Sequence, residues 1–349
     1  MNILFTCAGR RNLLLRYFRE ALAGRGRIYA ADVNPGAPAL QEADLAFIVL
    51  PYDHPYYLDQ LMALCRDYRV RLLISLNDLE LPLLAGQRES FLELGTIVAV
   101  SSPEVVNVCF DKWLMAKFLT SCGLWAPKTY LSLCEARRAL VQGTLSFPLV
   151  LKPRWGTGSI CVEYVEDEEE LELAYRWARR RIGRTILAGM SASDPDRAIL
   201  IQERLQDSEY VLDIINDLNG RYITTFAKLK LSDSSSSEGA IRVLTVEDQR
   251  LQRLGERIGK RLGHVGNLDC DLFVKDGRPY VLDLNPRFGG GYPFTHLAGA
   301  NLPAALIAWA SGLEPDATWL KIHPNFRASK YEDVVAIERV PVVIAQIPS

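Results

Sequence analysis

The sequence predicts an α/β protein, with a doubly wound parallel sheet over residues 1–108 and a longer part of α+β character after it. In the first hundred residues, short apolar runs alternate with segments whose apolar residues recur at helical spacing. This alternation is typical of βαβ units and a parallel sheet. After about residue 109, several predicted strands follow one another along the chain. A length of 349 residues is enough for two domains.

The first part contains five predicted strands and three predicted helices. The strands are expected at residues 2–6, 27–31, 47–50, 72–75 and 97–100, and the helices at 12–22, 57–68 and 79–92. The carboxyl ends of parallel strands form a ligand crevice in this architecture. Here the crevice would be lined by Gly9, Arg10, Asp32, Asn77, Asp78 and Glu80. The alternative is that these side chains only cap helices and line solvated loops.

A dinucleotide site is a weaker interpretation of the same region. The loop after the first strand carries one glycine, Gly9, whereas the fingerprint G-x-G-x-x-G needs three. Asp32, at the end of the second strand, would suit a ribose, but an acid at a strand end is common. An NAD-linked oxidoreductase is therefore kept only as the less favoured alternative.

Composition excludes several other classes of protein. The 40 Lys+Arg nearly balance the 42 Asp+Glu, so the chain lacks the basic excess of nucleic-acid or membrane-surface binders. No apolar run approaches the eighteen or so residues of a membrane helix, and the N-terminus lacks the layout of a signal peptide. Seven scattered cysteines without a C-x-x-C pair, and four isolated histidines, favour reduced thiols in the cytoplasm over a zinc site.

The second part combines strands with three helices, one of which is strongly charged. Strands are expected at 147–153, 199–203, 210–216 and 223–229, and helices at 111–122, 166–182 and 246–262. The helix at 166–182 has acids at its start and arginines at its end, which complements the helix dipole and indicates a solvated face. A serine-rich loop at 233–238 separates the last of these strands from the helix at 246–262.

Residues 266–291 are the most informative stretch, because they predict a β-hairpin that turns near Asp276. Period-two alternation places Asp283, Asn285 and Arg287 on one face of the second strand. A two-residue turn would separate Asp271 from Asp283. A three-residue loop at 275–277 would instead pair Asp269 with Asp283 and set Asp271 diagonal to it. We predict the three-residue loop.

The hairpin then offers an oxygen-only cation site. Two carboxylates and an amide, with neither thiols nor imidazoles, suit Mg²⁺, which commonly bridges substrate phosphates. Lys152 ends a strand just before the glycine loop Gly156-Thr157-Gly158-Ser159, and such loops wrap phosphate oxygens with backbone N–H groups. The chain lacks G-x-x-x-x-G-K-[ST], so a Walker-type nucleotide site is excluded. Bare carboxylates on an exposed polar face are the alternative.

The order of these motifs resembles the ATP-grasp superfamily. The resemblance is carried by Asp111-Lys112, Val150-Leu151-Lys152 with its glycine loop, Gln202-Glu203, Glu209-Tyr210, and Asp271 followed by Asp283-Leu284-Asn285-Pro286-Arg287. It is strongest to the carbamoyl-phosphate-synthase-like and carboxylate–amine ligase branches and extends over residues 1–313. It implies a pre-ATP-grasp domain at 1–108, an ATP-grasp domain at 109–315 and an extension at 316–349. Within the ATP-grasp domain it implies a small lid subdomain at about 120–203 and a larger subdomain at 204–315.

The resemblance also implies a role for each matching residue. ATP would be bound by Lys112, Lys152, the loop Gly156-Thr157-Gly158-Ser159, Glu203, Leu205, Glu209 and Lys228, and the metal by Asp271, Asp283 and Asn285. The metal would be Mg²⁺, with Mn²⁺ as the alternative ion. Arg287 and Lys230 would be the catalytic residues, although whether Lys228 or Lys230 points inward stays open. Both metal-site acids are Asp where Glu is more usual in the family, so the number of ions also stays open.

The activity implied is an ATP-dependent ligase that joins a carboxylate to an amine through an acyl phosphate, acting on an amino acid or a small peptide-like metabolite. Alternatives within the superfamily are a bicarbonate-activating enzyme that forms carboxyphosphate and a non-catalytic nucleotide-binding relative. The expected partners are small molecules, not nucleic acids or membranes. A strand expected at 340–344 in the extension pairs either with the grasp sheet or at a contact between two copies in a homodimer, and the sequence leaves both open.

Overall fold

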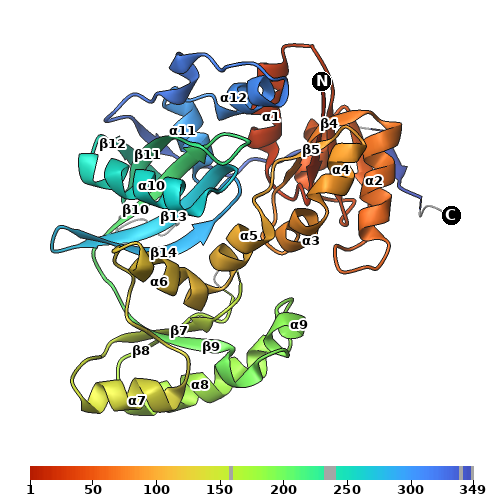
Figure 1. Cartoon of the computed structure of the whole chain (residues 1–349). Coiled ribbons are helices and arrows are strands. Elements are labelled where there is room, and N and C mark those ends of the chain that lie inside the picture. The colour runs from red at the N-terminus through yellow and green to blue at the C-terminus, as the bar shows by residue number, and fades with distance from the viewer. Residues whose placement is uncertain (157–159, 232–240, 338–340, 347–349) are drawn as a thin grey trace. The chain divides into compact units, whose positions relative to one another are not determined.

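The computed structural model describes residues 1–156, 160–231, 241–337 and 341–346, in two compact units (Figure 1). Unit 1 consists of Met1–Val106, Val211–Asp269 and Asn285–Ser349, and unit 2 consists of Asn107–Tyr210 and Cys270–Leu284. A parallel sheet in the N-terminal part and antiparallel pairing in the later part confirm the predicted fold class. Within the described residues, we find no helix with the length and apolar character needed to cross a membrane.

The N-terminal sheet belongs to unit 1 and has the strand order β16-β3-β2-β1-β4-β5, with parallel pairing throughout. Its strands are β1 (Asn2–Thr6), β2 (Ile28–Asp32), β3 (Leu45–Ile48), β4 (Val70–Ser75), β5 (Ile97–Val98) and β16 (Val342–Ile344). The order 3-2-1-4-5 among the first five strands is that of a doubly wound fold. The predicted parallel sheet is therefore confirmed.

Helices cover both faces of this sheet because its strands are apolar on both sides. Ile3 and Phe5 point into one hydrophobic cluster, whereas Leu4 belongs to a second cluster on the opposite face. The first face is covered by α1 (Asn12–Leu22), the 3₁₀ turn η1 (Pro38–Glu42) and α12 (Leu302–Ala310), and the second by α2 (Tyr57–Asp67), α3 (Leu81–Gly86) and α4 (Arg88–Glu93). The single helix predicted at 79–92 is wrong, because the chain breaks into two helices at Gln87.

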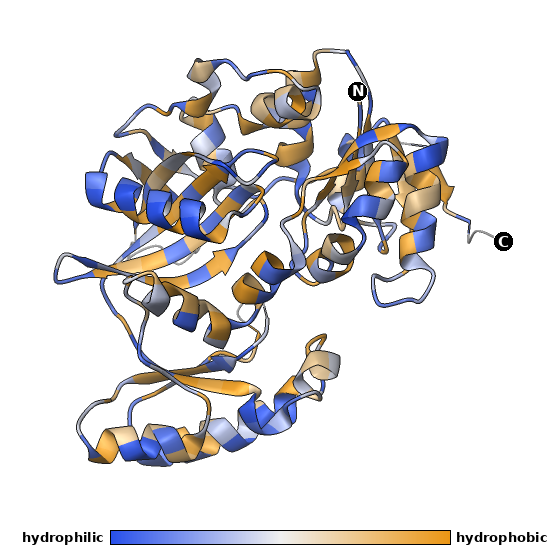
Figure 2. Ribbon diagram, in the orientation of Figure 1, coloured by the Kyte–Doolittle hydropathy of each residue, from blue (hydrophilic) through white to orange (hydrophobic). Residues whose placement is uncertain are grey.

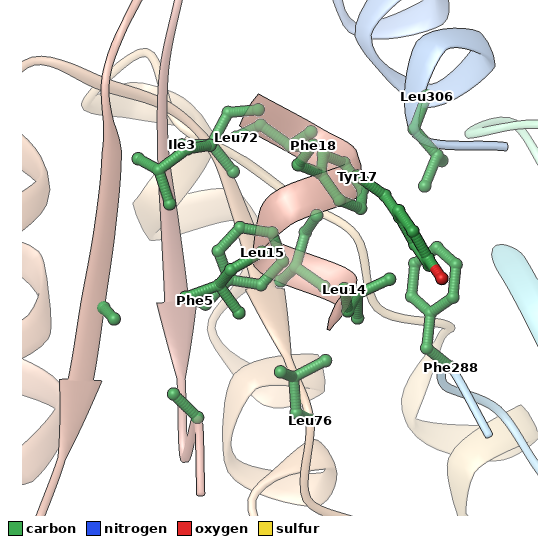
Figure 3. Close-up of a cluster of buried hydrophobic side chains, with 14 of the residues drawn as sticks. Ile3, Phe5, Leu14, Leu15, Tyr17, Phe18, Leu72, Leu76, Phe288 and Leu306 are labelled. Atoms are coloured by element: carbon green, nitrogen blue, oxygen red, sulfur yellow. The ribbon is translucent and has the colours of Figure 1, made fainter. Parts of the chain in front are cut away.

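The first cluster joins segments that are far apart in the sequence (Figure 3). Leu15 and Phe18 of α1 pack with Phe288 and with Leu306 of α12, and all four are at most 4% exposed. The N-terminal sheet therefore completes its core with residues from the last third of the chain.

The C-terminal strand β16 adds to the edge of the same sheet. Ala46 N donates to Pro341 O (3.0 Å), Ala345 N donates to Ile48 O (3.0 Å), and Gln60 Nε2 donates to Ala345 O (2.6 Å). Pairing of this strand with the grasp sheet, the first alternative left open by the sequence, is therefore wrong. The strand from the extension that does join that sheet is β15 (Arg327–Ser329), which pairs with β12 (Arg242–Val246).

The second sheet has the order β14-β13-β10-β11-β12-β15. Its remaining strands are β10 (Ser208–Asn216), β11 (Tyr222–Leu231), β13 (Gly266–Lys275) and β14 (Arg278–Asn285). The helices α10 (Gln249–Leu262) and α11 (Tyr292–Leu297) and the 3₁₀ turn η3 (Ala317–Leu320) lie in the same part of the chain. Figure 2 shows the polar outer face of α10. Its inner face approaches β11 so closely that a Cβ at Gly255 would lie 2.3 Å from the Thr225 hydroxyl.

Unit 2 contains an antiparallel sheet of order β6-β9-β7-β8. Its strands are β6 (Thr129–Tyr130), β7 (Leu149–Pro153), β8 (Glu163–Val165) and β9 (Ile199–Glu203). Its helical segments are α6 (Lys112–Ser121), α7 (Leu133–Val141), α8 (Glu168–Ile182), α9 (Ala188–Ser191) and η2 (Pro195–Arg197), and α5 (Pro103–Phe110) spans the boundary with unit 1. Helix α8 begins after the Asp167 cap and ends at Gly183, as its charge pattern predicts.

Candidate active site

Lys112 is held in place at the start of α6. The Asp111 carboxylate caps this helix by accepting from Trp113 N (2.9 Å) and Leu114 N (3.2 Å). The same carboxylate accepts from Arg154 Nε at 3.0 and 2.9 Å, and Lys112 N donates to Arg154 O (3.0 Å). The first residue of the helix therefore has a fixed backbone.

The Lys112 ammonium donates to both carboxylate oxygens of Asp283, at 2.8 and 2.7 Å. The side chain of Lys112 is 9% exposed and that of Asp283 is 25% exposed, so the pair is only partly shielded from water. Two residues 171 positions apart, predicted to hold phosphate and metal respectively, are in direct contact.

Lys152, on β7, completes a group of four charged side chains in unit 2. Burial and the nearby Lys112 ammonium lower the pKa of Lys152 from 10.5 to about 8, while Asp283 and Asp271 act in the opposite direction. We call Lys112, Lys152, Asp271 and Asp283 the open cluster. Its two lysines lie close enough to disfavour each other's charge, and an additional anion would relieve that repulsion.

The hairpin that carries the two acids turns differently from our prediction. Strand β13 ends at Lys275 and β14 begins at Arg278, so the loop has two residues and the predicted three-residue loop is wrong. Asp276 and Gly277 have φ of 50° and 74°, the left-handed pair that a type I′ turn requires. Asp-Gly is a favoured sequence for that turn.

A two-residue turn with unbroken alternation would separate Asp271 from Asp283. Burial along β14 does not keep a period of two, because Val281 and Leu284, three residues apart, are 0% and 1% exposed. Asp271 and Asp283 both act on the charge of Lys152. The two carboxylates therefore lie near the same ammonium although the loop is shorter than predicted.

The cation site predicted at this hairpin has a suitable donor set. Asp271, Asp283 and Asn285 offer carboxylate and amide oxygens, which hard divalent ions prefer. In the parts of the chain that the structure describes, no three His, Cys, Asp or Glu side chains form a metal-binding group. A site here would therefore use two carboxylates with an amide, and water or phosphate oxygens would supply the remaining ligands.

Arg287 lies in unit 1 and is firmly held. Its Nη2 donates to Asp78 (2.7 Å), and its Nη1 donates to Phe288 O (3.2 Å) and approaches Asp269 at 3.5 Å. The side chain is 9% exposed. Asp78 was expected in the N-terminal crevice, but its pairing with Arg287, 209 residues away, was not.

Lys228 on β11 is buried, and its ammonium already has partners within the protein. Its ammonium forms an ion pair with Asp213 and donates to Thr295 Oγ1 (2.7 Å), and all three side chains are 0% exposed. Asn267 Nδ2 also donates to Asp213 (3.1 Å). We call Asp213, Lys228, Asn267 and Thr295 the buried cluster. Lys230, two residues along the strand, is only half-buried.

The residues expected around the adenine and the ribose lie at the end of β9 and on β10. Glu203 Oε1 accepts from Lys128 N (2.9 Å), Leu205 is 7% exposed, and Glu209 is half-buried on β10. Of the predicted phosphate loop, Gly156 has φ 145°, and a Cβ there would lie 2.8 Å from Leu187 Cδ1. Thr157, Gly158 and Ser159 lie outside the described residues, as does the serine-rich loop at 233–238.

Two acids of the N-terminal crevice have internal roles. The Asp32 carboxylate accepts from the backbone N–H groups of Gly9 (2.8 Å) and Asn34 (2.9 Å). Glu80 is completely buried and accepts from Thr6 (2.7 Å), Ser75 (2.5 Å) and Tyr57 (2.7 Å). Burial raises the pKa of Glu80. These contacts support a structural interpretation for both residues.

Sequence reasoning missed four residues that the structure brings into polar clusters. Arg11, Asp213, Asn267 and Thr295 were not among the candidates, although Arg11 directly follows the named Arg10. Asp213 lies on the same face as Val211 and Ile215, in a strand that is buried on both faces. A charged residue inside such a strand is the one sequence signal that could have marked it.

Comparisons with known proteins identify relatives for both parts of the chain. A family described as the PylC-like, N-terminal domain matches residues 3–99. A family described as ATP-grasp in the biosynthetic pathway with Ter operon matches residues 195–334. The carbamoyl phosphate synthase large chain of Methanosphaerula palustris is 28% identical over 239 residues, which cover 66% of this chain and 21% of that protein. The chain therefore spans about a fifth of the length of the curated relatives it matches.

Solved structures share the fold over nearly the whole chain. A biotin carboxylase from Campylobacter jejuni, in a βγ-ATP complex, matches with a TM-score of 0.71 at 17% identity and covers 92% of this chain and 73% of its own. An L-amino acid ligase from Bacillus licheniformis matches with a TM-score of 0.65 at 20% identity and covers 94% of this chain and 78% of its own. At these identities the similarity establishes the fold.

Proposed function

Because the chain belongs to the ATP-grasp superfamily, we propose that it is an ATP-dependent ligase that joins a carboxylate to an amine and releases ADP and phosphate. The observation that carries the proposal is the open cluster, in which Lys112 and Lys152 meet the acids of the β13–β14 hairpin. Two cations beside an oxygen-only cation site are what phosphoryl transfer from a nucleotide requires, since such catalysis depends on positioning and charge neutralisation.

Lys112 and Lys152 would bind phosphate oxygens of ATP. The lowered pKa of Lys152 supports this role, because an anionic phosphate would offset the repulsion from Lys112 and favour the charged form of both lysines. Asp271, Asp283 and Asn285 would hold Mg²⁺, or Mn²⁺ in its place, and the ion would supply further charge neutralisation. Asp283 now gives both oxygens to Lys112. Nucleotide binding would therefore move the Lys112 ammonium from the carboxylate to the phosphate.

The chemistry follows from the poor reactivity of carboxylates, whose leaving group would be oxide. An oxygen of the substrate carboxylate attacks the γ-phosphorus of ATP, the bond to ADP breaks, and an acyl phosphate forms. The amine then attacks the acyl carbon, phosphate leaves with the bonding electrons, and the amine loses a proton. Arg287 would face the acyl phosphate or the substrate carboxylate, and Lys228 or Lys230 would supply the remaining phosphate-side cation. The burial of Lys228 favours Lys230 for direct contact.

An amino acid or a small peptide-like metabolite is the substrate class we favour, and similarity to an L-amino acid ligase supports it. Activation of bicarbonate through carboxyphosphate is the second candidate, favoured by the carbamoyl phosphate synthase relatives. The cytoplasmic location, the homodimer and the domain boundaries at residues 108 and 315 stay predictions.

The direct test measures ADP release with ATP, Mg²⁺ and a panel of amino acids, supplied singly and in pairs, with and without bicarbonate. We expect amino acid-dependent ADP release and an amide product detectable by mass spectrometry. Release that depends on bicarbonate alone would select the second candidate. Failure of every combination to release ADP would contradict the ligase proposal.

Asp283→Ala tests the metal assignment. We expect it to abolish ADP release while far-UV circular dichroism and thermal melting stay close to those of the wild type, because the Asp283 side chain is partly exposed. Asp196→Ala is the matched control, since that carboxylate is 85% exposed and pairs with Arg179 on the surface. Normal turnover in Asp283→Ala would remove Asp283 from the site.

A further inference from the structure

Besides the buried cluster, unit 1 contains another group of charged side chains, which combines residues from the N-terminal part of the chain with residues from its last third. Arg287 donates to Asp78 (2.7 Å) and approaches Asp269 at 3.5 Å. The side chains of Asp78 and Asp269 are 8% and 11% exposed. Arg11, at the loop between β1 and α1, lies within electrostatic range of all three. We call Arg11, Asp78, Asp269 and Arg287 the arginine cluster.

The backbone at Gly289 and Gly290 approaches this cluster closely. A Cβ at Gly289 would lie 2.1 Å from the Asp269 carboxylate, so a side chain there would collide with it. At Gly290 a Cβ would lie 3.5 Å from Arg11 Nη1. Gly289 therefore lets the chain pass against the Asp269 carboxylate, and the Arg11 guanidinium lies next to the backbone at Gly290.

Arg11 differs from the other members of the arginine cluster in the hydrogen bonds and ion pairs of its side chain. In the described ranges of the chain, its side chain forms neither a hydrogen bond nor an ion pair, whereas Arg287 has a carboxylate and a carbonyl as acceptors. Arg11 is nevertheless half-buried, and burial together with the charge of Arg287 lowers its pKa. A half-buried guanidinium next to a like charge is stabilised by an anion that both can reach.

The charges already present narrow the choice of anion. Two guanidiniums face two carboxylates, so the cluster itself is close to neutral. A singly charged planar carboxylate matches the fork of Arg11 in bidentate geometry. A doubly charged phosphate would meet more repulsion from Asp78 and Asp269.

We propose that Arg11 is a substrate-binding residue that receives a carboxylate beside Arg287 at the Gly289–Gly290 backbone. This inference rests on the proposed ligase function, because it assigns a recognition site to one of its substrates. The carboxylate could belong to the acid substrate or to an amine substrate that is itself an amino acid. The experiment distinguishes these two sources.

The first arm measures carboxylate binding without turnover. Thermal melting of the full-length protein is followed with acetate, and with neutral acetamide as the control, at constant ionic strength. Wild type and Arg253→Gln should be stabilised by acetate and not by acetamide, whereas Arg11→Gln should lose that stabilisation. Arg253 is the matched control because it is an exposed arginine of α10 that lies outside the arginine cluster. Equal stabilisation of Arg11→Gln, or none of the wild type, would overturn the proposal.

The second arm uses the substrates found by ADP release. We expect Arg11→Gln to raise the KM for one substrate by about 10- to 100-fold, the loss of one charge-assisted hydrogen bond, with kcat changed far less. The substrate whose KM rises is the one that carries the recognised carboxylate. Arg11→Lys keeps the positive charge but not the planar guanidinium. Its KM should therefore lie between that of the wild type and that of Arg11→Gln. It also replaces Arg11→Gln if that variant does not fold.

The two arms separate the two proposals. Acetate binding that depends on Arg11, in a protein that releases no ADP with any substrate pair, would support the carboxylate site and reject the ligase function. ADP release with an unchanged KM for both substrates in Arg11→Gln would keep the ligase function and reject the role of Arg11.

Discussion

Two lysine–aspartate pairs in this protein consist of the same chemical groups and differ in their surroundings. In the buried cluster, Lys228 and Asp213 are both 0% exposed, and Thr295 and Asn267 take up further hydrogen-bonding capacity. In the open cluster, Asp283 is 25% exposed, and the ammonium of Lys112 has a second cation, Lys152, nearby. The first pair is satisfied within the protein, whereas in the second the two ammonium groups repel each other, and an anionic ligand would relieve that repulsion.

This difference shows what separates a structural ion pair from one available to a ligand. Removing one partner of a buried pair leaves an isolated charge in a medium that cannot solvate it, and this is costly. A partly exposed pair keeps access to water, so exchanging one partner costs little. We therefore expect mutations in the buried cluster to act on stability and mutations in the open cluster to act on activity.

Asp213→Ala should have the largest effect on stability. It leaves the Lys228 ammonium buried without its counterion, and the expected loss in the free energy of unfolding is about 3–5 kcal/mol, measured by urea denaturation. Asp283→Ala, in the open cluster, should lose less than Asp213→Ala, because the Asp283 side chain is 25% exposed. Similar losses in the two variants would contradict the distinction between the clusters.

A double variant provides the control for that prediction. Asp213→Leu combined with Lys228→Met removes both charges and should be more stable than Asp213→Ala, because no isolated charge remains in the core. If the double variant is the less stable of the two, packing and not charge explains the loss.

Thr295→Val should have an intermediate effect. The change keeps the shape of the side chain and removes a hydroxyl that donates to Asp213 and accepts from Lys228. Hydrogen bonds to charged groups contribute about 1.5–3 kcal/mol, so we expect a loss of that size in urea denaturation. Thr318→Val is the control, because the Thr318 hydroxyl bonds to Asp316 at an exposed site and its loss should cost about 0.5 kcal/mol or less.

Local patterns in the sequence were sufficient for most elements of the fold. The helix at 12–22 has the predicted bounds, and the strand at 199–203 does as well, because each carries a clear apolar period. The prediction of a single helix at 79–92 was wrong, because a break at Gln87 leaves the apolar period on either side unchanged. Packing of Phe288 and Leu306 under the N-terminal sheet joins distant segments and leaves no local trace.

The open cluster shows how far sequence reasoning reached into the candidate site. Lys112, Lys152, Asp271 and Asp283 are brought together as the motifs implied, but the three-residue loop meant to align the acids is absent. Burial that departs from a period of two along β14 depends on tertiary packing, so the sequence could not reveal it. The same limit applies to Lys228 and Lys230, which share a strand face by alternation and differ only in what covers them.

A smaller effect than that of Asp213→Ala concerns the dependence of stability on pH. Folding lowers the pKa of Lys152 from 10.5 to about 8, so between these values the unfolded chain binds more protons than the folded protein. Stability attributable to Lys152 therefore rises with pH through this window, and below pH 8 the cost of burying its charge is present in full.

Lys152→Met isolates this contribution from the other groups that titrate at alkaline pH. The free energy of unfolding is measured in urea at several values from pH 7.5 to 9.5 for both proteins. Relative to the variant, the wild type should gain about 2 kcal/mol across the range, since one proton contributes up to about 1.4 kcal/mol per pH unit. Parallel pH profiles would mean that Lys152 keeps an ordinary pKa in the folded protein. Lys112 would then not disfavour the charge of Lys152, and the open cluster would differ from the buried cluster only in its exposure to water.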